Sequence, residues 1–298
     1  MSNRVWRTLS AFNPSTRLWT PASPRNAQNR CTQKLSLTSW NIDGFSPRAV
    51  SRSKLILGHI LADAPDIIFL QEVTRDVRAS LLGDERVRRA FLTTDAEDQT
   101  SFAQVPFATM TLLSRDRFAC NQDLQQGDEE KFMFRRVFRM SLPSKYRRDA
   151  LCVDVTAQDT MFRLINVHFD SLGDTLQYRA QQMHILADLL REPGCGGGII
   201  AGDFNAISPE DAALIDKNGL VDAWVALHGA TNGATWSVGV ERRDGLRSRR
   251  LDKVAMLGLK AEEMEILRPG RIKVPTPGDK FLEIPWSDHC GLRCTFTV

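Results

Sequence analysis

The chain has 298 residues, of which 42% are hydrophobic and 25% charged, and it carries a formal net charge of +3. This composition is typical of a globular protein with one sizeable core, and it excludes a disordered chain, a collagen and a small disulfide scaffold. The longest apolar runs, such as residues 67–70, are far shorter than the roughly 18 to 20 residues of a membrane-spanning helix, so we expect no membrane span.

Residues 1–34 are expected to form a basic, acid-free N-terminal arm, and residues 35–298 one domain. The first 42 residues hold six cationic and no acidic side chains, so the remainder of the chain is net acidic. Such a segment also resembles a mitochondrial transit peptide, but prolines at 14, 21 and 24 interrupt any long helix and favour a flexible arm. Trp6 and Trp19 suggest that this arm packs back onto the domain.

From residue 35 onward, short apolar strands alternate with helical periodicity, which predicts an α/β fold. We expect strands over residues 35–40, 67–71, 108–113, 151–155, 161–167, 198–202 and 292–298, and helices over 49–62, 76–91 and 175–190. The polar stretch 121–130 predicts a surface loop, residues 157–160 a turn between neighbouring strands, and residues 193–198 a flexible connector.

Six cysteines are spread through the chain without a C-x-x-C pair. This pattern favours reduced thiols in an intracellular protein. Cysteine and histidine nowhere fall at zinc-ligand spacing, so we expect no zinc site.

Four apolar strands each end in polar residues that could bind metal or phosphate. These residues are Asn41 with Asp43, Glu72, His168, and Asp203 with Asn205; a fifth cluster, Ser287-Asp288-His289, precedes the last strand. If the strands lie side by side, their ends meet on one rim. Carboxylate and amide oxygens without thiolates suit Mg²⁺, with Mn²⁺ as a substitute, and the set as a whole suits metal-assisted phosphodiester hydrolysis.

Several short motifs resemble those of the endonuclease/exonuclease/phosphatase superfamily. They are W-N-I-D-G at 40–44, L-Q-E-V at 70–73, G-D-F-N at 202–205, R-L-D at 250–252 and S-D-H at 287–289. The H-x-D-S motif at 168–171 and Thr235-Trp236 are more similar to the 5′-tyrosyl-DNA phosphodiesterase (type 2) branch than to the abasic endonucleases. The resemblance implies a DNase I-like four-layer α/β sandwich, with two packed mixed β-sheets flanked by helices and the site at one edge.

The resemblance also implies a role for each matching residue. Those that would bind metal are Glu72, Asp43 and Asp288. Those that would act in hydrolysis are Asp203, Asn205, His289, Asp252, His168 and Asn41. Asp203, helped by Asn205, would orient and deprotonate a water. His289, oriented by Asp252, would donate to the scissile phosphate, while His168 and Ser171 would contact phosphate.

Two positions depart from the DNA-repair enzymes of this branch. Where those enzymes carry arginines after the histidine motif and after the G-D-x-N motif, this chain has Gly173 and Ile207. Other basic and aromatic residues could bind substrate instead. Five arginines lie between residues 242 and 250, and among them Arg247, Arg249 and Arg250 are expected to reach flanking phosphates, with Trp236 forming a groove wall. The acid-free segment 131–148 is either a partner surface or simply solvated.

Three functions remain open at this stage. The first is a Mg²⁺-dependent phosphodiesterase acting on nucleic acid, with DNA bearing a 5′ adduct or end as its partner. The second is a phosphoesterase of the same fold for an inositol phosphate or a phospholipid headgroup, and the third is a degenerate domain that only binds. We expect an intracellular monomer, nuclear or cytoplasmic, with a mitochondrial location compatible with the basic N-terminus.

Overall fold

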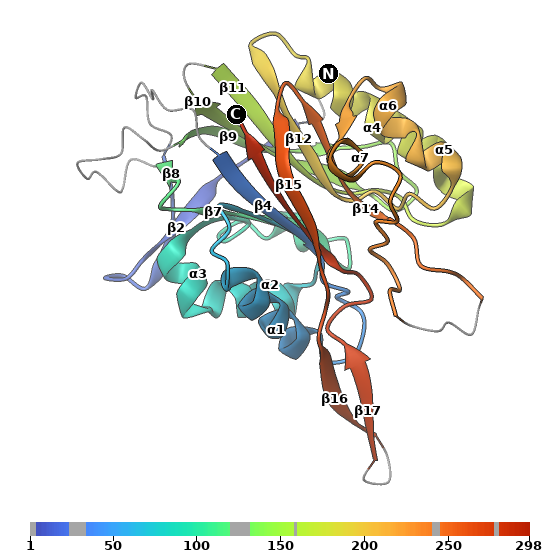
Figure 1. Cartoon of the computed structure of the whole chain (residues 1–298). Helices are drawn as coiled ribbons and strands as arrows, with labels where there is room; N and C mark the ends of the chain where they lie inside the picture. The colour runs from blue at the N-terminus through green and yellow to red at the C-terminus, as the bar shows by residue number, and fades with distance from the viewer. Residues whose placement is uncertain (1–3, 24–33, 120–131, 158–159, 240–244, 277–279) are drawn as a thin grey trace.

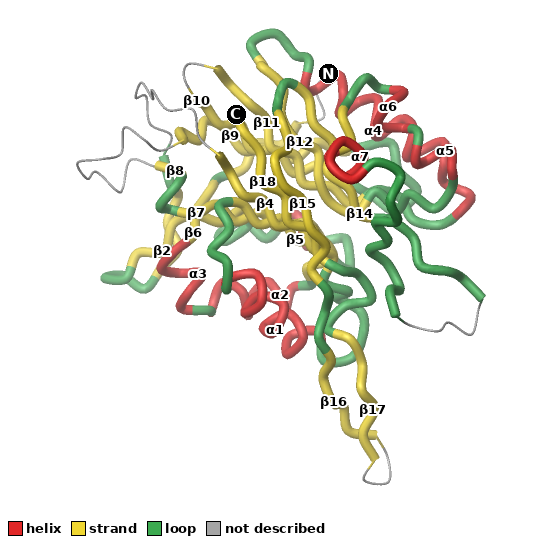
Figure 2. Tube along the Cα trace, viewed as in Figure 1, coloured by secondary structure: helices red, strands yellow, loops and turns green. Residues whose placement is uncertain are grey.

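The computed structural model describes residues 4–23, 34–119, 132–157, 160–239, 245–276 and 280–298. Two large mixed β-sheets pack face to face, and helices cover the outer face of each (Figures 1 and 2). The predicted four-layer α/β sandwich is therefore confirmed. No helix in the described part of the chain is long and apolar enough to cross a membrane.

The first sheet has eight strands within the described residues. In spatial order they are β1 (Arg4–Arg7), β9 (Phe132–Ser141), β10 (Asp149–Ala157), β11 (Thr160–His168), β12 (Cys195–Asp203), β14 (Asp252–Leu257) and β13 (Val221–Asp222), with β8 (Phe118–Ala119) paired to β9. Strands β11 and β12 are parallel, so their carboxyl ends lie at the same edge.

The second sheet also has eight described strands. In order they are β15 (Lys260–Leu267), β18 (Gly291–Thr297), β4 (Lys34–Asn41), β5 (Ile67–Val73), β7 (Ala108–Ser114), β6 (Phe91–Thr94), β2 (Leu9–Asn13) and β3 (Leu18–Pro21). Strands β4 and β5 are the parallel pair of this sheet. Each sheet thus contributes one parallel pair that ends in predicted site residues.

The helices lie on the two outer faces. The second sheet is covered by α1 (Ala49–Leu61), α2 (Arg75–Gly83) and α3 (Glu85–Ala90) (Figure 1). The first sheet is covered by α4 (Leu176–Leu190), α5 (Pro209–Ala212) and α6 (Leu214–Lys217). Helix α7 (Ala223–His228) contacts β14 and β15. Short 3₁₀ turns occupy Thr100–Phe102 and Gly173–Thr175. One apolar core fills the space between the two sheets. A second lies between the first sheet and its helices, and a third lies between the second sheet and its helices.

A hairpin of β16 (Arg271–Thr276) and β17 (Lys280–Pro285) forms a separate two-stranded sheet that projects from the body (Figure 1). It directly precedes the Ser287-Asp288-His289 cluster. Its last residues therefore lead into the site described below.

The predicted strands and the helices over 49–62 and 175–190 are present with ends shifted by a few residues. The single helix expected over 76–91 is wrong, because Asp84 breaks it: its backbone is extended and its side chain caps α3 through Arg86 N–H. The connector expected over 193–198 is also wrong in part, since β12 begins at Cys195. The loop expected over 121–130 and the centre of the turn at 157–160 lie outside the described residues.

The expectation of a flexible N-terminal arm is wrong for residues 4–21, because they form three strands that extend both sheets. The ring of Trp6 meets Phe138 edge-on at 5.5 Å, and Trp19 donates its indole N–H to the Leu82 carbonyl at 3.3 Å. The packing that the two tryptophans suggested is present. The boundary between arm and domain at residue 34 stays a prediction, because residues 24–33 are not described.

Candidate functional site

The four polar strand ends lie together at one edge of the sandwich. Asn41 and Glu72 belong to the parallel strands β4 and β5, and His168 and Asp203 end the parallel strands β11 and β12. Because the two sheets face each other, the two pairs approach across the sandwich: Asn41 Nδ2 donates to Asp203 Oδ2 at 2.9 Å and to Glu72 Oε1 at 3.3 Å.

Asp203 lies at the centre of this cluster. Its Oδ2 lies 3.5 Å from His168 Nε2 and 3.7 Å from His289 Nε2, and its Oδ1 accepts the backbone N–H of Asn205 at 2.8 Å. Burial raises the pKa of Asp203 to about 6, although the neighbouring His289 opposes the shift. The preceding Gly202 permits this close packing, because it has φ +140° and a Cβ there would overlap the Val167 carbonyl oxygen.

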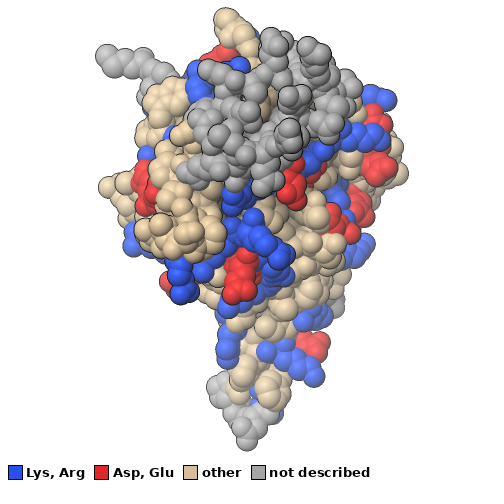
Figure 3. Space-filling view, turned by 90° about the vertical axis from the view of Figure 1, so that its left-hand side faces the viewer, with Lys and Arg blue, Asp and Glu red and all other residues tan. Residues whose placement is uncertain are grey.

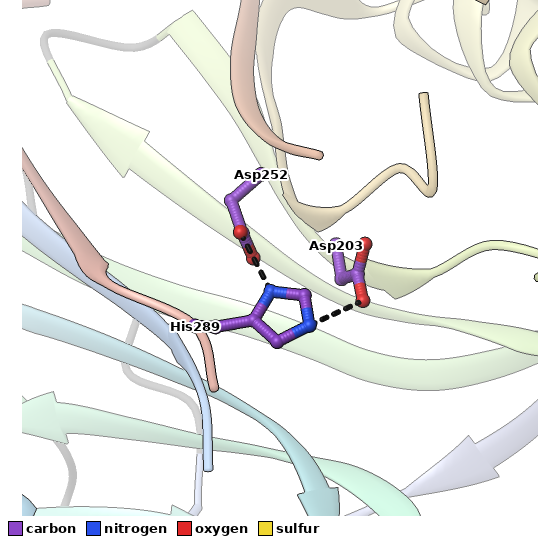
Figure 4. A group of neighbouring side chains, drawn as sticks. All are labelled: Asp203, Asp252 and His289. Carbon is purple, nitrogen blue, oxygen red and sulfur yellow. Dashed lines mark hydrogen bonds and ion pairs between the residues drawn. The ribbon is translucent and has the colours of Figure 1, made fainter. Parts of the chain in front are cut away.

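His289 and Asp252 form a buried pair beside Asp203 (Figure 4). His289 Nδ1 lies 2.8 Å from Asp252 Oδ2, while Nε2 faces Asp203. Burial alone would lower the pKa of His289, but the carboxylates of Asp252 and Asp203 raise it well above its ordinary value. The imidazole is therefore held in a fixed orientation as a cation that can donate through Nε2.

Trp40 and Ser287 hold the backbone of His289 in place. Trp40, fully buried in β4, donates its indole N–H to the His289 carbonyl at 3.0 Å. The Ser287 hydroxyl donates to the Asn41 carbonyl at 2.6 Å and accepts the His289 backbone N–H at 3.0 Å. The S-D-H segment is thus tied to the end of β4, which carries Asn41.

Three site residues have a strained backbone. Asp43, Glu72 and Asn205 adopt φ of 51°, 57° and 48°, in the left-handed region that non-glycine residues rarely occupy. At Glu72 the pairing of β5 with β7 is interrupted, which turns this residue out of regular strand geometry. Strain of this kind persists only where surrounding contacts fix it, and it concentrates at functional sites.

The carboxylates outnumber the cations at this edge, which suits a bound divalent cation. Burial raises the pKa of Glu72 to about 7, and burial also raises the pKa of Asp43. Atoms of Asp203, Asp252 and His289 lie close enough together to hold an ion. His289 Nδ1 already contacts Asp252, and Glu72 and Asp43 provide further carboxylate oxygens, the type of donor that Mg²⁺ prefers.

Asp288 and Trp236, assigned separately from the sequence, are hydrogen-bond partners. The indole N–H of Trp236 donates to Asp288 Oδ2 at 2.9 Å, and the backbone of Trp236 bridges to both His289 and Arg249. Asp288 Oδ1 also lies 3.9 Å from His289 Nε2. Trp236 therefore stands at the rim of the site with its ring held by Asp288.

His168 and Ser171 line a cavity of about 330 Å³ next to the cluster. Phe107 stacks on the His168 ring at 5.3 Å, and Arg148 places Nη2 3.3 Å from His168 Nε2. Burial, followed by the charge of Arg148, lowers the pKa of His168 well below its ordinary value, so this imidazole is neutral. Phe107, Tyr146 and Arg148 line the same cavity, and the sequence analysis did not assign them to the site.

Arg148 was visible in the sequence only as part of the basic segment 131–148. The structure brings this side chain, from the β9–β10 turn, to His168, where it interacts with the charges of Asp203 and Glu72. Gly173, one of the two positions that lack an arginine, has open space around its Cα. The structure thus places the Arg148 cation beside His168, one of the residues predicted to contact phosphate.

The predicted arginine loop is described only in part. Arg250 makes a bidentate ion pair with Asp222 at 2.8 and 2.9 Å, so its guanidinium is already engaged. Arg247 is exposed, and the backbone of Arg249 pairs with Trp236 at the rim. Arg242 and Arg243 lie outside the described residues. Phosphate binding by Arg247, Arg249 and Arg250 stays a prediction.

The comparisons with known proteins agree with this geometry. A family model described as the endonuclease/exonuclease/phosphatase family matches residues 38–289. Tyrosyl-DNA phosphodiesterase 2 of Mus musculus is 25% identical over 288 residues, which are 93% of this chain and 70% of that protein. The 5′-tyrosyl-DNA phosphodiesterase of Caenorhabditis briggsae is 24% identical, over 89% of this chain and 70% of that protein.

Among solved structures, D. rerio TDP2 complexed with a single-strand DNA product is similar in fold. The TM-score is 0.66 at 20% identity, and the match covers 89% of this chain and all of that one. At this level of identity the likeness supports the fold alone.

Proposed function

The chain belongs to the endonuclease/exonuclease/phosphatase family, and from this premise we propose that this phosphoric-ester hydrolase is a Mg²⁺-dependent phosphodiesterase acting on DNA. We further propose that its substrate is a 5′ end carrying a tyrosyl adduct. Relatives that match most of the chain are named tyrosyl-DNA phosphodiesterases, which supports this substrate class.

The position of Asp203 is the observation that carries the proposal. Its carboxylate lies among an amide, two imidazoles and the nearby Glu72 carboxylate, at the meeting point of two parallel strand pairs. An attacking water, a phosphate and a metal ion need groups of these kinds within a few ångströms of one another.

Each residue has a distinct task in the proposed reaction. Asp203, with a pKa of about 6, is ionised at neutral pH and can accept a proton from the attacking water. His289, kept cationic by Asp252, donates through Nε2 to a phosphate oxygen as negative charge develops. Neutral His168 and cationic Arg148 hold the phosphate from the cavity side.

Glu72 and Asp43 would hold the metal ion, with Asn41 beside them and Asp288 at the rim. When bound, Mg²⁺ would neutralise charge on the phosphate and the leaving oxygen. The excess of carboxylates over cations around Asp203 supports a divalent ion over a purely protein-based mechanism.

The cavity beside His168 supports an aromatic leaving group. Its volume of about 330 Å³ lies at the lower end of the range for small-molecule sites, and its walls include the rings of Phe107 and Tyr146 and the guanidinium of Arg148. A phenol ring could stack there, with its developing phenolate charge close to Arg148.

The proposal is tested by Mg²⁺-dependent hydrolysis with the wild type and Asp203→Asn. The substrates are a 5′-phosphotyrosyl oligonucleotide, a plain oligonucleotide, an abasic duplex and inositol phosphates. We expect release of tyrosine that leaves a 5′-phosphate and is lost in the variant. Hydrolysis confined to inositol phosphates would overturn the DNA substrate, and Mg²⁺-independent hydrolysis would overturn the metal.

A further inference from the structure

A second cavity lies at the opposite end of the second sheet. It has a volume of about 460 Å³, and its lining residues are Phe12, Pro14, Arg17, Glu85, Arg88, Arg89 and Arg115. Four arginines and a single acidic residue therefore surround one hollow. None of them belongs to the site described above.

The distance from the catalytic site follows from strand register. Arg88 and Arg89 precede β6, whose first residue pairs with Ser114 at the end of β7, and Ser114 N–H donates to the Asp66 carbonyl. Asp66 directly precedes β5, and Glu72 lies near the other end of that strand. Six residues of extended chain span about 20 Å, so the two sites are separate.

The arginines converge from three segments of the chain. Arg17 comes from the β2–β3 turn, Arg88 and Arg89 from the last turn of α3, and Arg115 from the turn after β7. A helix C-terminus attracts cations, which accounts for the two arginines of α3. It does not account for Arg17 and Arg115, whose charges add to a field that favours a multiply charged anion.

The walls of the cavity are held in place. Arg88 stacks over the Phe12 ring at 4.6 Å and donates Nε–H to the Leu82 carbonyl at 2.9 Å. The same carbonyl accepts the Trp19 indole N–H, which fixes the β2–β3 hairpin against the end of α2. A guanidinium oriented in this way loses little freedom when it binds a phosphate.

Figure 3 faces the side of the molecule on which β2 and α3 lie in Figure 1. Blue side chains gather around a red one near the middle of this face. A cavity lined by four arginines and one glutamate has the charge that suits an anion with several charges.

From these observations we propose that this cavity is a distal binding site for compounds with adjacent phosphate groups. Two sources share this chemistry: a free polyphosphate chain and the backbone of a nucleic-acid strand. The site binds without hydrolysis, because Glu85 is the one carboxylate among its described lining residues.

Binding is measured by calorimetry with tripolyphosphate and, separately, a short oligothymidylate, at low salt and with EDTA so that no catalytic metal contributes. The test variant is Arg17→Ala/Arg89→Ala, whose side chains are both exposed. The matched control is Lys54→Ala/Arg86→Ala, which removes the same charge from α1 and α3 without touching the cavity lining. A single Arg89→Glu variant repeats the test with only one substitution.

We expect the test variants to weaken tripolyphosphate binding by about tenfold or more, and the control to change it by less than about twofold. An equal loss of oligothymidylate binding identifies the strand backbone as the ligand, and oligothymidylate binding that is unchanged identifies the free polyphosphate. Equal effects of test and control variants, or no measurable binding of either probe to the wild type, would overturn the site. Neither outcome depends on hydrolytic activity.

Discussion

Arg148 Nη2 lies 3.3 Å from His168 Nε2, so a permanent cation contacts an imidazole that is itself kept neutral. The arrangement concentrates positive charge on Arg148 and leaves His168 as a neutral hydrogen-bonding partner. Arg148 also interacts favourably with the carboxylates of Asp203 and Glu72 across the site. In the proposed reaction, Arg148 would help cationic His289 to balance the charge that develops on a bound phosphate.

We therefore predict that Arg148→Met lowers kcat by about 10²-fold to 10³-fold, because a preorganised donor facing developing charge contributes that much in other enzymes. Arg191→Met is the control, since that exposed side chain donates to the Asn218 and Gly219 carbonyls and does not line the cavity beside His168. Steady-state hydrolysis of the preferred substrate gives both values. Equal losses in the two variants would show that general charge, and not this contact, matters.

Trp40→Phe should lower both stability and kcat. It leaves the His289 carbonyl without its buried donor, which costs about 1 to 3 kcal/mol of unfolding free energy. Trp19→Phe removes a comparable indole bond to the Leu82 carbonyl, far from the site. Urea unfolding and kcat are measured for both variants. If Trp19→Phe lowers kcat as much as Trp40→Phe, Trp40 does not position His289.

Asp252→Asn should leave metal binding intact while it reduces turnover. Asp252 is the largest contributor that raises the pKa of His289, so its neutralisation lowers that pKa. The cationic imidazole is then lost at a lower pH, and the alkaline limb of the pH profile of kcat/KM should move towards acid. A profile that falls uniformly without moving would contradict the assignment of His289 as the donor.

Much of this site could be predicted because its residues end strands. The apolar runs before Asn41, Glu72, His168 and Asp203 define four strands, and parallel neighbours bring their ends to one edge. The sandwich arrangement was predicted from the family resemblance, because periodicity along the chain carries no information on how the sheets stack.

Contacts made by loops could not be predicted in this way. Arg148 reaches His168 across a turn, and Arg250 pairs with Asp222 from 28 residues away. Such contacts depend on the tertiary structure and leave no local periodicity. The break at Asp84 was missed for a different reason, because the apolar spacing on both sides of it continues as in a single helix.

Glu72 offers a test that separates stability from metal binding. Its folded pKa of about 7 is higher than the ordinary value of 4.5, so the metal-free fold prefers the protonated form. The contribution of Glu72 to the stability of the wild type should therefore be most favourable below about pH 4.5. It should become less favourable as the pH rises towards 7 and above. At pH 8 the loss is on the order of 1 to 3 kcal/mol.

Glu72→Gln removes this penalty, and the amide oxygen can still accept the Asn41 hydrogen bond. In EDTA at pH 8 the variant should therefore unfold at a higher temperature than the wild type, and the difference should disappear near pH 4.5. With excess Mg²⁺ the order should reverse, because only the wild type gains stability by binding the ion. Thermal unfolding with and without Mg²⁺ measures both effects. If Mg²⁺ stabilises the two proteins equally, Glu72 is not a metal ligand.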